Sequence, residues 1–308
     1  MGGPQERAPI ERDPIRRKLA VVFPGQAAHE PGIGRSLYEN FPSAREVFEQ
    51  ADASLGYSIT ELCFDGPPEQ LAQTEVAQAA IGTVCIAAYR AAKERCPNLQ
   101  PTVGGGVSFG ELTNLVAANV IDLPTFFRIV QERGAIMEGV GAICEETGTY
   151  PALYYPSFVT VAGTNSNLDE TMKAWGKQGG RSRETGIQYP FHSPLMGEAE
   201  KRLRKFLGSI SFQNPDYAIV LNATGKESTS GEEIKDALPD QLVHAVDVPR
   251  SVARMRQLGG EVFIEFSPKP FLGGLVGKVD EKIQGISVFD IDSVKELGEH
   301  IASGDISS

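Results

Sequence analysis

Residues 104–115 read Gly-Gly-Gly-Val-Ser-Phe-Gly-Glu-Leu-Thr-Asn-Leu and give the clearest local indication of how this chain folds. It contains a G-x-S-x-G pattern centred on Ser108, typical of a sharp strand-to-helix turn that exposes one serine hydroxyl. Gly106 and Gly110 suit such a turn because side chains there would collide with its opposite arm. The pattern also fits a glycine-rich loop that happens to hold a serine, so its context has to separate the two interpretations.

The composition is that of a large globular chain with an acidic balance. Its 308 residues are 41% hydrophobic, and 29 basic against 40 acidic side chains leave a net charge of −11. A chain this acidic is a poor candidate for non-specific binding of nucleic acid. We expect no membrane insertion either, because no apolar run reaches the length that spans a bilayer.

The cysteines and histidines give no pattern of metal ligands. Cys63, Cys85, Cys96 and Cys144 lack C-x-x-C spacing, and the four histidines are scattered along the chain. We therefore expect reduced thiols in a cytoplasmic protein and no metal cluster.

Strand and helix patterns alternate through the first 140 residues. Residues 19–23 and 102–107 are short apolar strands, and the second of them leads into Ser108. A helix over 111–120 leaves the turn, and another runs from 122 to about 140. This alternation predicts a mainly parallel sheet with helices on both faces.

The pattern changes after residue 141. Residues 145–156 are short and rich in turns, 157–163 read as a strand, and 168–177 as a helix that carries the single tryptophan, Trp175. Apolar segments then resume, with a strand over 217–222, a helix over 231–245 that Pro239 can interrupt, a helix over 248–258, and a strand over 261–266.

Four motifs, in order, resemble those of one family: the malonyl-CoA:acyl-carrier-protein transacylases and the related acyltransferase domains of polyketide synthases. Phe23-Pro24-Gly25-Gln26 is similar to FPGQ, and Gly-Val-Ser-Phe-Gly-Glu at 106–111 is similar to GHSLGE. Arg133-Gly134 followed by Met137 resembles RG-x-x-M, and Phe-His-Ser-Pro-Leu-Met at 191–196 matches FHSPLM. Asn222, Gln241-Leu242 and 265–269 are weaker matches. Four ordered motifs are a specific signal.

The resemblance implies roles for particular residues. Ser108 would be the nucleophile and His192 its general base, oriented by a backbone carbonyl where a triad has a carboxylate. The backbone N–H groups of Gln26 and Phe109 would form the oxyanion hole. The residues implied in substrate binding are Arg133, which would pair with a carboxylate on the acyl group, Phe191 and Gln241.

The resemblance also implies the architecture, an α/β-hydrolase-like core with a mainly parallel sheet and an inserted ferredoxin-like subdomain. We assign 1–18 to a mobile N-terminal arm, 19–140 and 189–308 to the large catalytic domain, and 141–188 to the small inserted subdomain. This insertion is short for the family and lacks its first strand and helix, so we predict a truncated subdomain above the acyl pocket. Val107 also stands where the family has histidine.

The resulting hypothesis is an acyltransferase that moves an acyl group, malonyl first of all, from CoA to the phosphopantetheine thiol of an acyl carrier protein. An ester on Ser108 would be the intermediate, in fatty acid or polyketide biosynthesis. The resemblance implies no bound cofactor, with acyl-CoA and the carrier protein as substrates. The shortened subdomain favours two alternatives: transfer of a bulkier acyl group between carrier proteins, and hydrolysis of carrier thioesters. A catalytically silent docking subunit is the remaining hypothesis, which the intact Ser108, His192 and Arg133 disfavour.

Basic residues on either side of His192 predict where an acidic carrier protein docks. They are Lys173, Lys177, Arg181 and Arg183 before it, and Lys201, Arg202, Arg204 and Lys205 after it. The alternative is that these side chains form ordinary solvated helix faces.

Overall fold

The structure is a computed structural model that describes residues 18–25, 30–71, 73–141, 148–155, 158–177, 179–185, 187 and 189–303. Within these ranges, the side chains of Lys18, Thr74 and positions 133–141 are not described. The predicted N-terminal arm lies outside the described residues except for Lys18, which begins the first strand.

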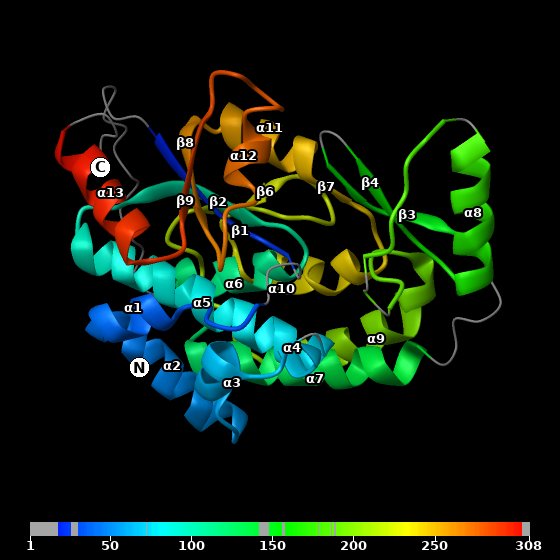
Figure 1. The fold of residues 1–308 in the computed structure, drawn as a ribbon, viewed down its shortest axis with the longest axis horizontal. Helices are drawn as coiled ribbons and strands as arrows, with labels where there is room; N and C mark the ends of the chain where they lie inside the picture. Colours follow the sequence, from blue (N-terminus) through cyan, green and yellow to red (C-terminus); the bar gives the residue numbers. More distant parts are fainter. Residues whose placement is uncertain are drawn as a thin grey trace.

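A six-stranded sheet forms the centre of the molecule (Figure 1). Its order is β6-β5-β2-β1-β8-β9, and every neighbouring pair is parallel except β5 and β6. The strands are β1 (Lys18–Phe23), β2 (Pro101–Gly106), β5 (Ala218–Val220), β6 (Glu227–Ser228), β8 (Gly260–Phe266) and β9 (Gln284–Val288). The predicted α/β fold with a mainly parallel sheet is confirmed.

The side chains of β1 divide the core into two clusters. Leu19, Val21 and Phe23 belong to one cluster, and Ala20 and Val22 belong to the other. Successive side chains of a strand point to opposite faces, so a continuous apolar run is what a sheet covered on both sides requires.

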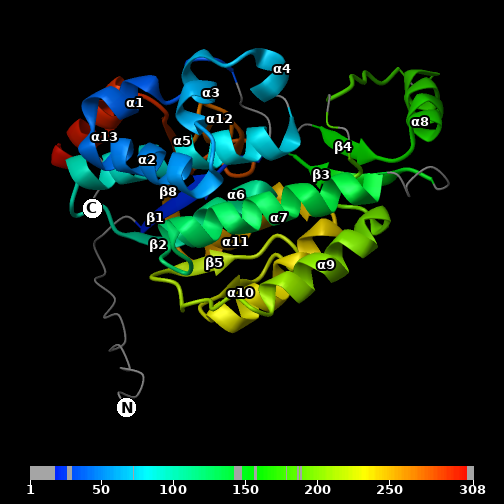
Figure 2. The ribbon, with the colours of Figure 1, turned by 90° about the horizontal axis from the view of Figure 1, so that it is seen from below.

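Helices cover both faces of this sheet. Residues of ten helices enter the first cluster: α1 (Arg35–Asn40), α2 (Pro42–Leu55), α3 (Ile59–Asp65), α4 (Pro68–Leu71), α5 (Thr74–Arg95), α6 (Phe109–Ala117), α7 (Leu123–Gly141), α9 (Gly197–Leu207), α10 (Gly231–Ala237) and α13 (Ile291–Ala302). The second cluster lies under α11 (Val248–Gln257) and α12 (Gly273–Val276). Figure 2 shows α7 and α9 side by side on the helical face, where they are in contact.

A second, three-stranded sheet lies at one end of the molecule, with α8 (Asn165–Lys177) outermost (Figures 1 and 2). Strand β3 (Tyr150–Tyr154) pairs antiparallel with β4 (Val159–Ala162) and parallel with the short β7 (Val246–Asp247). A complete ferredoxin-like unit has the order β-α-β-β-α-β. The described residues between α7 and the 3-10 helix η2 (Pro194–Met196) form only β3, β4 and α8. Because β7 lies beyond residue 188, this sheet is not confined to the predicted insertion 141–188.

The structure corrects several predicted elements. The segment 145–156 was expected to be turns, yet 150–154 form β3, and the next strand begins at Val159 rather than at 157. The helix expected over 231–245 ends at Ala237, and Pro239, where an interruption was expected, begins the short 3-10 helix η3 (Pro239–Leu242). A proline inside a helix lacks the N–H that the helix needs, which explains the break. Helices α3 and α13 were not predicted.

Candidate active site

Ser108 occupies a strained turn between β2 and α6. Its φ is +55° and its ψ is −114°, a conformation that residues with a side chain rarely adopt. A Cβ on Gly106 would lie 2.0 Å from the carbonyl carbon of Gly110, and one on Gly110 would lie 2.2 Å from the carbonyl oxygen of Phe23. Both glycines are therefore required by close backbone contact, as the sequence predicted, and the turn presents the partly exposed Ser108 at the carboxyl end of β2.

His192 forms a hydrogen-bonded pair with Ser108, here called the dyad. The distance from His192 Nε2 to Ser108 Oγ is 2.7 Å, and that from His192 Nδ1 to the backbone oxygen of Gln241 is 2.8 Å. Since a carbonyl oxygen only accepts, Nδ1 carries the proton and Nε2 is left to accept from the serine hydroxyl. The ring is 2% exposed, so this arrangement is held inside the protein.

Gln241 approaches the dyad from η3. Its carbonyl orients His192, and its side-chain Nε2 donates to the carbonyl oxygen of Ser108 at 3.0 Å and to the carboxylate of Glu111. The residue is 3% exposed. Its amide therefore donates to two groups of the protein, and the predicted contact of Gln241 with substrate stays a prediction.

Asn222, which follows β5, supports the turn from the other side. Its Oδ1 accepts the N–H of Ser108 at 2.7 Å, and its Nδ2 donates to the carbonyl oxygen of Gly106 at 2.6 Å. Asn222 was not predicted to contribute to the site. The signal was its weak family match directly after a strand, which gave no indication of contact with Ser108.

The two expected oxyanion-hole residues are placed unequally. Phe109 is the first residue of α6, so its N–H has no acceptor within the helix, and its ring packs 5.9 Å from that of Phe126 in the core. Gln26 belongs to 26–29, which lie outside the described residues. The preceding Gly25 lies against the turn, since a Cβ there would be 3.8 Å from Cβ of Ser108.

The two other predicted substrate-binding residues lie on different elements. Arg133 lies in α7, but its side chain is outside the described part. Phe191 is 8% exposed, and its ring lies 5.8 Å from that of Tyr189 and 6.4 Å from that of His192. Phe191 therefore packs beside the catalytic histidine candidate.

Val107 points away from the dyad into the second core cluster. It is 5% exposed and, with Gly106, Leu272, Met255 and six other residues, lines a cavity of about 20 Å³. The side chain that replaces the histidine of the family motif is thus an ordinary apolar core residue.

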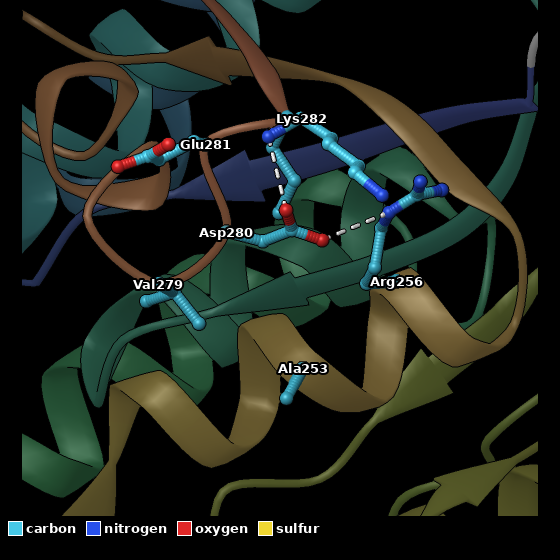
Figure 3. A pocket seen from close by; sticks show the side chains of 7 residues that line it. Ala253, Arg256, Val279, Asp280, Glu281 and Lys282 are labelled. Carbon is cyan, nitrogen blue, oxygen red and sulfur yellow. Dashed lines mark hydrogen bonds and ion pairs between the residues drawn. The ribbon is translucent and has the colours of Figure 1, made fainter.

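A larger, open cavity of about 490 Å³ is lined by residues that include Arg256, Asp280 and Lys282 (Figure 3). Arg256, at the end of α11, pairs with Asp280 at 3.3 Å and donates to the carbonyl of Gly260, where β8 begins. Ser108 follows the carboxyl end of the parallel strand β2, so the cavity lies at the opposite end of the sheet.

The described thiols and acids offer no competing site. Burial raises the pKa of Cys63, Cys85 and Cys96, which keeps these free thiols protonated and weak as nucleophiles. Among the residues that the structure describes, no group of three His, Cys, Asp or Glu side chains could hold a metal ion. In the same part of the chain, no helix combines the length and hydrophobicity needed to cross a bilayer.

The predicted basic clusters are exposed, but they are not equivalent. Arg204 pairs with Glu200 at 2.6 Å and with Asp240 at 2.5 Å, so it ties α9 to η3. Arg202 pairs with Glu198 at 3.3 Å, whereas Lys201 and Lys205 form no ion pair with another described residue. The prediction treated Arg204 as part of a free docking face, and its structural ion pairs argue against that use.

Comparison with known proteins identifies relatives over most of the chain. A family model described as an acyl transferase domain matches residues 20–291. The malonyl CoA-acyl carrier protein transacylase of Haemophilus influenzae is 32% identical over 311 residues, covering 92% of this chain and 99% of that protein. The protein of the same name from Bacillus subtilis is 29% identical, covering 90% of this chain and 95% of that protein.

Solved structures agree with these matches. An acyl carrier protein S-malonyltransferase from Vibrio cholerae superposes with a TM-score of 0.83 at 28% identity, covering 91% of this chain and 99% of that one. A malonyl-transacylase solved in complex with its type II polyketide synthase acyl carrier protein gives a TM-score of 0.86 at 27% identity, covering 92% and 99%.

Proposed function

Since the chain belongs to the acyl transferase domain family and, within it, to the malonyl-CoA–acyl carrier protein transacylases, we propose that it transfers malonyl groups from CoA to an acyl carrier protein. The observation that carries this proposal is the chain of contacts from Ser108 Oγ through His192 to the carbonyl of Gln241. It provides a nucleophile, a base and an acceptor that fixes the tautomer of the base.

In the first half-reaction, Ser108 Oγ attacks the thioester carbonyl of malonyl-CoA while His192 Nε2 takes the hydroxyl proton. The Gln241 carbonyl stabilises the resulting imidazolium through Nδ1–H. The N–H of Phe109 faces the developing oxyanion, and Gln26 is the proposed second donor. Collapse of the tetrahedral intermediate breaks the C–S bond, and His192 returns its proton to the CoA thiolate.

The second half-reaction repeats these steps with the carrier protein. His192 takes the proton of the phosphopantetheine thiol, the thiolate attacks the ester on Ser108, and the C–O bond breaks. Ser108 recovers its proton from His192, so the enzyme returns to its starting state. Serine, histidine and backbone groups supply all the chemistry of this cycle, and we propose that it needs no cofactor or metal.

Arg133 and Phe191 are the proposed selectors of the acyl group. A guanidinium can clamp the free carboxylate of malonate in a bidentate pair. Arg133→Ala should then lower acylation by malonyl-CoA by at least about 100-fold, because a desolvated carboxylate left unpaired costs several kcal/mol. Acetyl-CoA has no such carboxylate and should lose little. Equal losses with both donors would assign Arg133 a structural role.

The experiment that tests the function combines stopped-flow detection of CoA with intact-mass spectrometry. Mixing with malonyl-CoA should release one equivalent of CoA in a burst and add one malonyl group to the protein. Adding a phosphopantetheinylated acyl carrier protein should then clear the adduct and malonylate the carrier. Absence of both burst and adduct would rule the proposal out.

One observation favours a second candidate, the transfer of a bulkier acyl group or the hydrolysis of carrier thioesters. The described residues between α7 and η2 form only β3, β4 and α8, which leaves a small cover beside the large domain. A panel of acyl-CoAs and acyl carriers in the same mass assay decides between the candidates. A lasting adduct from a longer acyl group, without one from malonyl, would favour the second.

The proposed setting is the cytoplasm, with acidic carrier proteins as partners. The three described cysteines are free, which suits a reducing compartment. The exposed Lys201, Arg202 and Lys205 on α9 are the proposed contacts for the carrier, since α9 directly follows the loop that holds His192.

A further inference from the structure

The carboxylate of Glu111 is buried beside the dyad and has no part in the proposed reaction. Glu111 is 1% exposed and lies in the first turn of α6, three residues after Ser108. Its Oε1 accepts the backbone N–H of Asn222 at 3.2 Å, and its Oε2 accepts from Nε2 of Gln241. Two segments that are remote in the sequence therefore meet on this side chain.

Asn222 connects Glu111 to the nucleophile. In an ordinary capping box, a glutamate three residues after the helix N-cap would accept the backbone N–H of the N-cap residue. Here the N-cap is Ser108, and the acceptor of its N–H is Oδ1 of Asn222 at 2.7 Å. Glu111 instead accepts the backbone N–H of Asn222, the residue that takes its place at the cap.

Gln241 connects Glu111 to the base. One hydrogen of its side-chain amide goes to the carbonyl of Ser108 and the other to Glu111, while its own carbonyl accepts from His192 Nδ1. Any rotation of the Gln241 amide would break a contact with the turn. Fixing this amide also fixes the position of the residue that orients the histidine.

The conformation of Ser108 explains why such support is needed. A non-glycine residue at φ +55° and ψ −114° is strained and persists only where its surroundings determine it. Asn222 holds the Ser108 N–H and the Gly106 carbonyl, and Gln241 holds the Ser108 carbonyl. Glu111 lies between Asn222 and Gln241, and both residues donate a hydrogen bond to it. A carboxylate suits this place because it only accepts hydrogen bonds.

We propose that Glu111 is a positioning residue that sets Ser108 and His192 relative to each other through Asn222 and Gln241. Testing this proposal with malonyl-CoA rests on the proposed function. The hydrogen bonds of Glu111 that support the proposal do not depend on that function. Glu111 acts before any substrate arrives, and so it should matter equally for every reagent that needs an activated Ser108.

The variant that tests the proposal is Glu111→Gln, which keeps the size of the side chain. One accepting oxygen becomes an NH2 group, which would face either the N–H of Asn222 or the side-chain amide of Gln241 and could accept from neither. Two rates are measured, single-turnover acylation by malonyl-CoA and inactivation by phenylmethylsulfonyl fluoride, which modifies an activated serine without CoA. We expect both rates to fall by a similar factor, roughly 10- to 100-fold, since small displacements of reacting groups cost this much. The KM for malonyl-CoA should stay near that of the wild type.

Tyr217→Phe is the matched control. It removes the buried hydrogen bond from Tyr217 to Asn114 Oδ1, on the same helix α6, without touching the dyad or its partners. The thermal stability of Tyr217→Phe should fall by about as much as that of Glu111→Gln, while both rates stay within about twofold of the wild type. Asn222→Ala should mimic Glu111→Gln, and the double variant should lose less than the product of the two factors because the residues act together.

The outcomes separate the possibilities. Unchanged rates in Glu111→Gln, or an equal loss in Tyr217→Phe, would overturn the proposal, and a loss with malonyl-CoA alone would make Glu111 a substrate contact instead. Should Glu111→Gln fail to fold, Asn222→Ala must show the paired loss of both rates or the proposal falls. A wild type that is sulfonylated but not malonylated would refute the proposed function, and the sulfonylation rates would still decide the role of Glu111.

Discussion

The turn around Ser108 and the small unit of β3, β4 and α8 differ in how much of each is held by buried side chains. At the turn, the polar groups of Ser108 are held by His192, Asn222 and Gln241, which are all at least 96% buried. In the small unit, α8 has no buried residue. Five of the seven large hydrophobic side chains found exposed in the described structure lie in these elements or in the turn between β3 and β4: Tyr154, Phe158, Val159, Val161 and Trp175.

This difference indicates how much displacement and sequence change each region tolerates. The turn must keep reacting atoms within hydrogen-bond reach, so it is built from contacts that cannot shift independently. The small unit has few contacts to lose, so its sequence can vary at little cost in stability. We therefore expect substitutions at the turn to be severe and those in the small unit to be mild.

The largest effects should come from the dyad itself. Ser108→Ala should abolish the malonyl adduct in intact-mass spectra while the protein stays folded, because the hydroxyl is the attacking group and fills no part of the core. His192→Ala should slow acylation by about 10²- to 10⁴-fold, the usual contribution of a general base. An adduct of normal stoichiometry in Ser108→Ala would contradict the assignment.

Two glycines test the difference in packing directly. Gly106→Ala should destabilise the protein by about 3 kcal/mol or more, since its Cβ would meet backbone atoms of Gly110 that cannot move aside. Gly176→Ala, in α8, has nothing within 4 Å of the new Cβ and should stabilise by about 0.5 kcal/mol through helix propensity. Thermal unfolding of both variants measures the contrast, and similar shifts would show that the two regions are equally constrained.

Helix α7 is the element that precedes β3 in the chain, and Asp122 caps its start. Hydrogen bonds from the hydroxyl and the N–H of Thr125 lower the pKa of Asp122, so the carboxylate stabilises the folded state above the unfolded pKa of about 4. This stabilisation disappears as the pH falls through the lower, folded-state pKa. Asp122→Ala should cost about 1 kcal/mol at pH 7 and less at pH 3.

Asp122→Asn provides the control for this prediction, because an asparagine still caps the helix but has no charge to lose. Its unfolding temperature relative to the wild type should rise as the pH drops from 7 to 3. A difference between Asp122→Ala and wild type that is constant over this range would mean that the charge of Asp122 contributes nothing.

The smallest effects should come from the exposed basic face of α9. Reversing Arg202 and Lys205 to glutamate should raise the KM for carrier protein several-fold, most at low salt, and leave acylation by malonyl-CoA unchanged. Reversing Lys278 and Lys282 changes the net charge equally at the other end of the sheet and should have no effect. Equal rises in KM would mean that overall charge, and not this face, attracts the carrier.

Most of the elements that were predicted correctly follow from local patterns in the sequence. The apolar run of β1, the glycines around Ser108 and the strand and helix that flank it are visible in the sequence because each depends on neighbours a few residues away. Strand β3 was missed since its Pro151 and the prolines and tyrosines around it resemble turn residues, and pairing with β4 and β7 overrides that preference.

Sequence patterns were enough to predict the fold class, the family resemblance and the candidates Ser108 and His192, because motifs and periodicity are local properties of a chain. The motif resemblance also implied that His192, 84 positions from Ser108, acts as its base. The supporting contacts are visible only in the folded chain: Asn222 lies 114 positions from Ser108, and Gln241 lies 130 positions from Glu111. Contacts over such separations leave no trace in the spacing of one sequence, since they exist only once the sheet has brought the ends of its strands together.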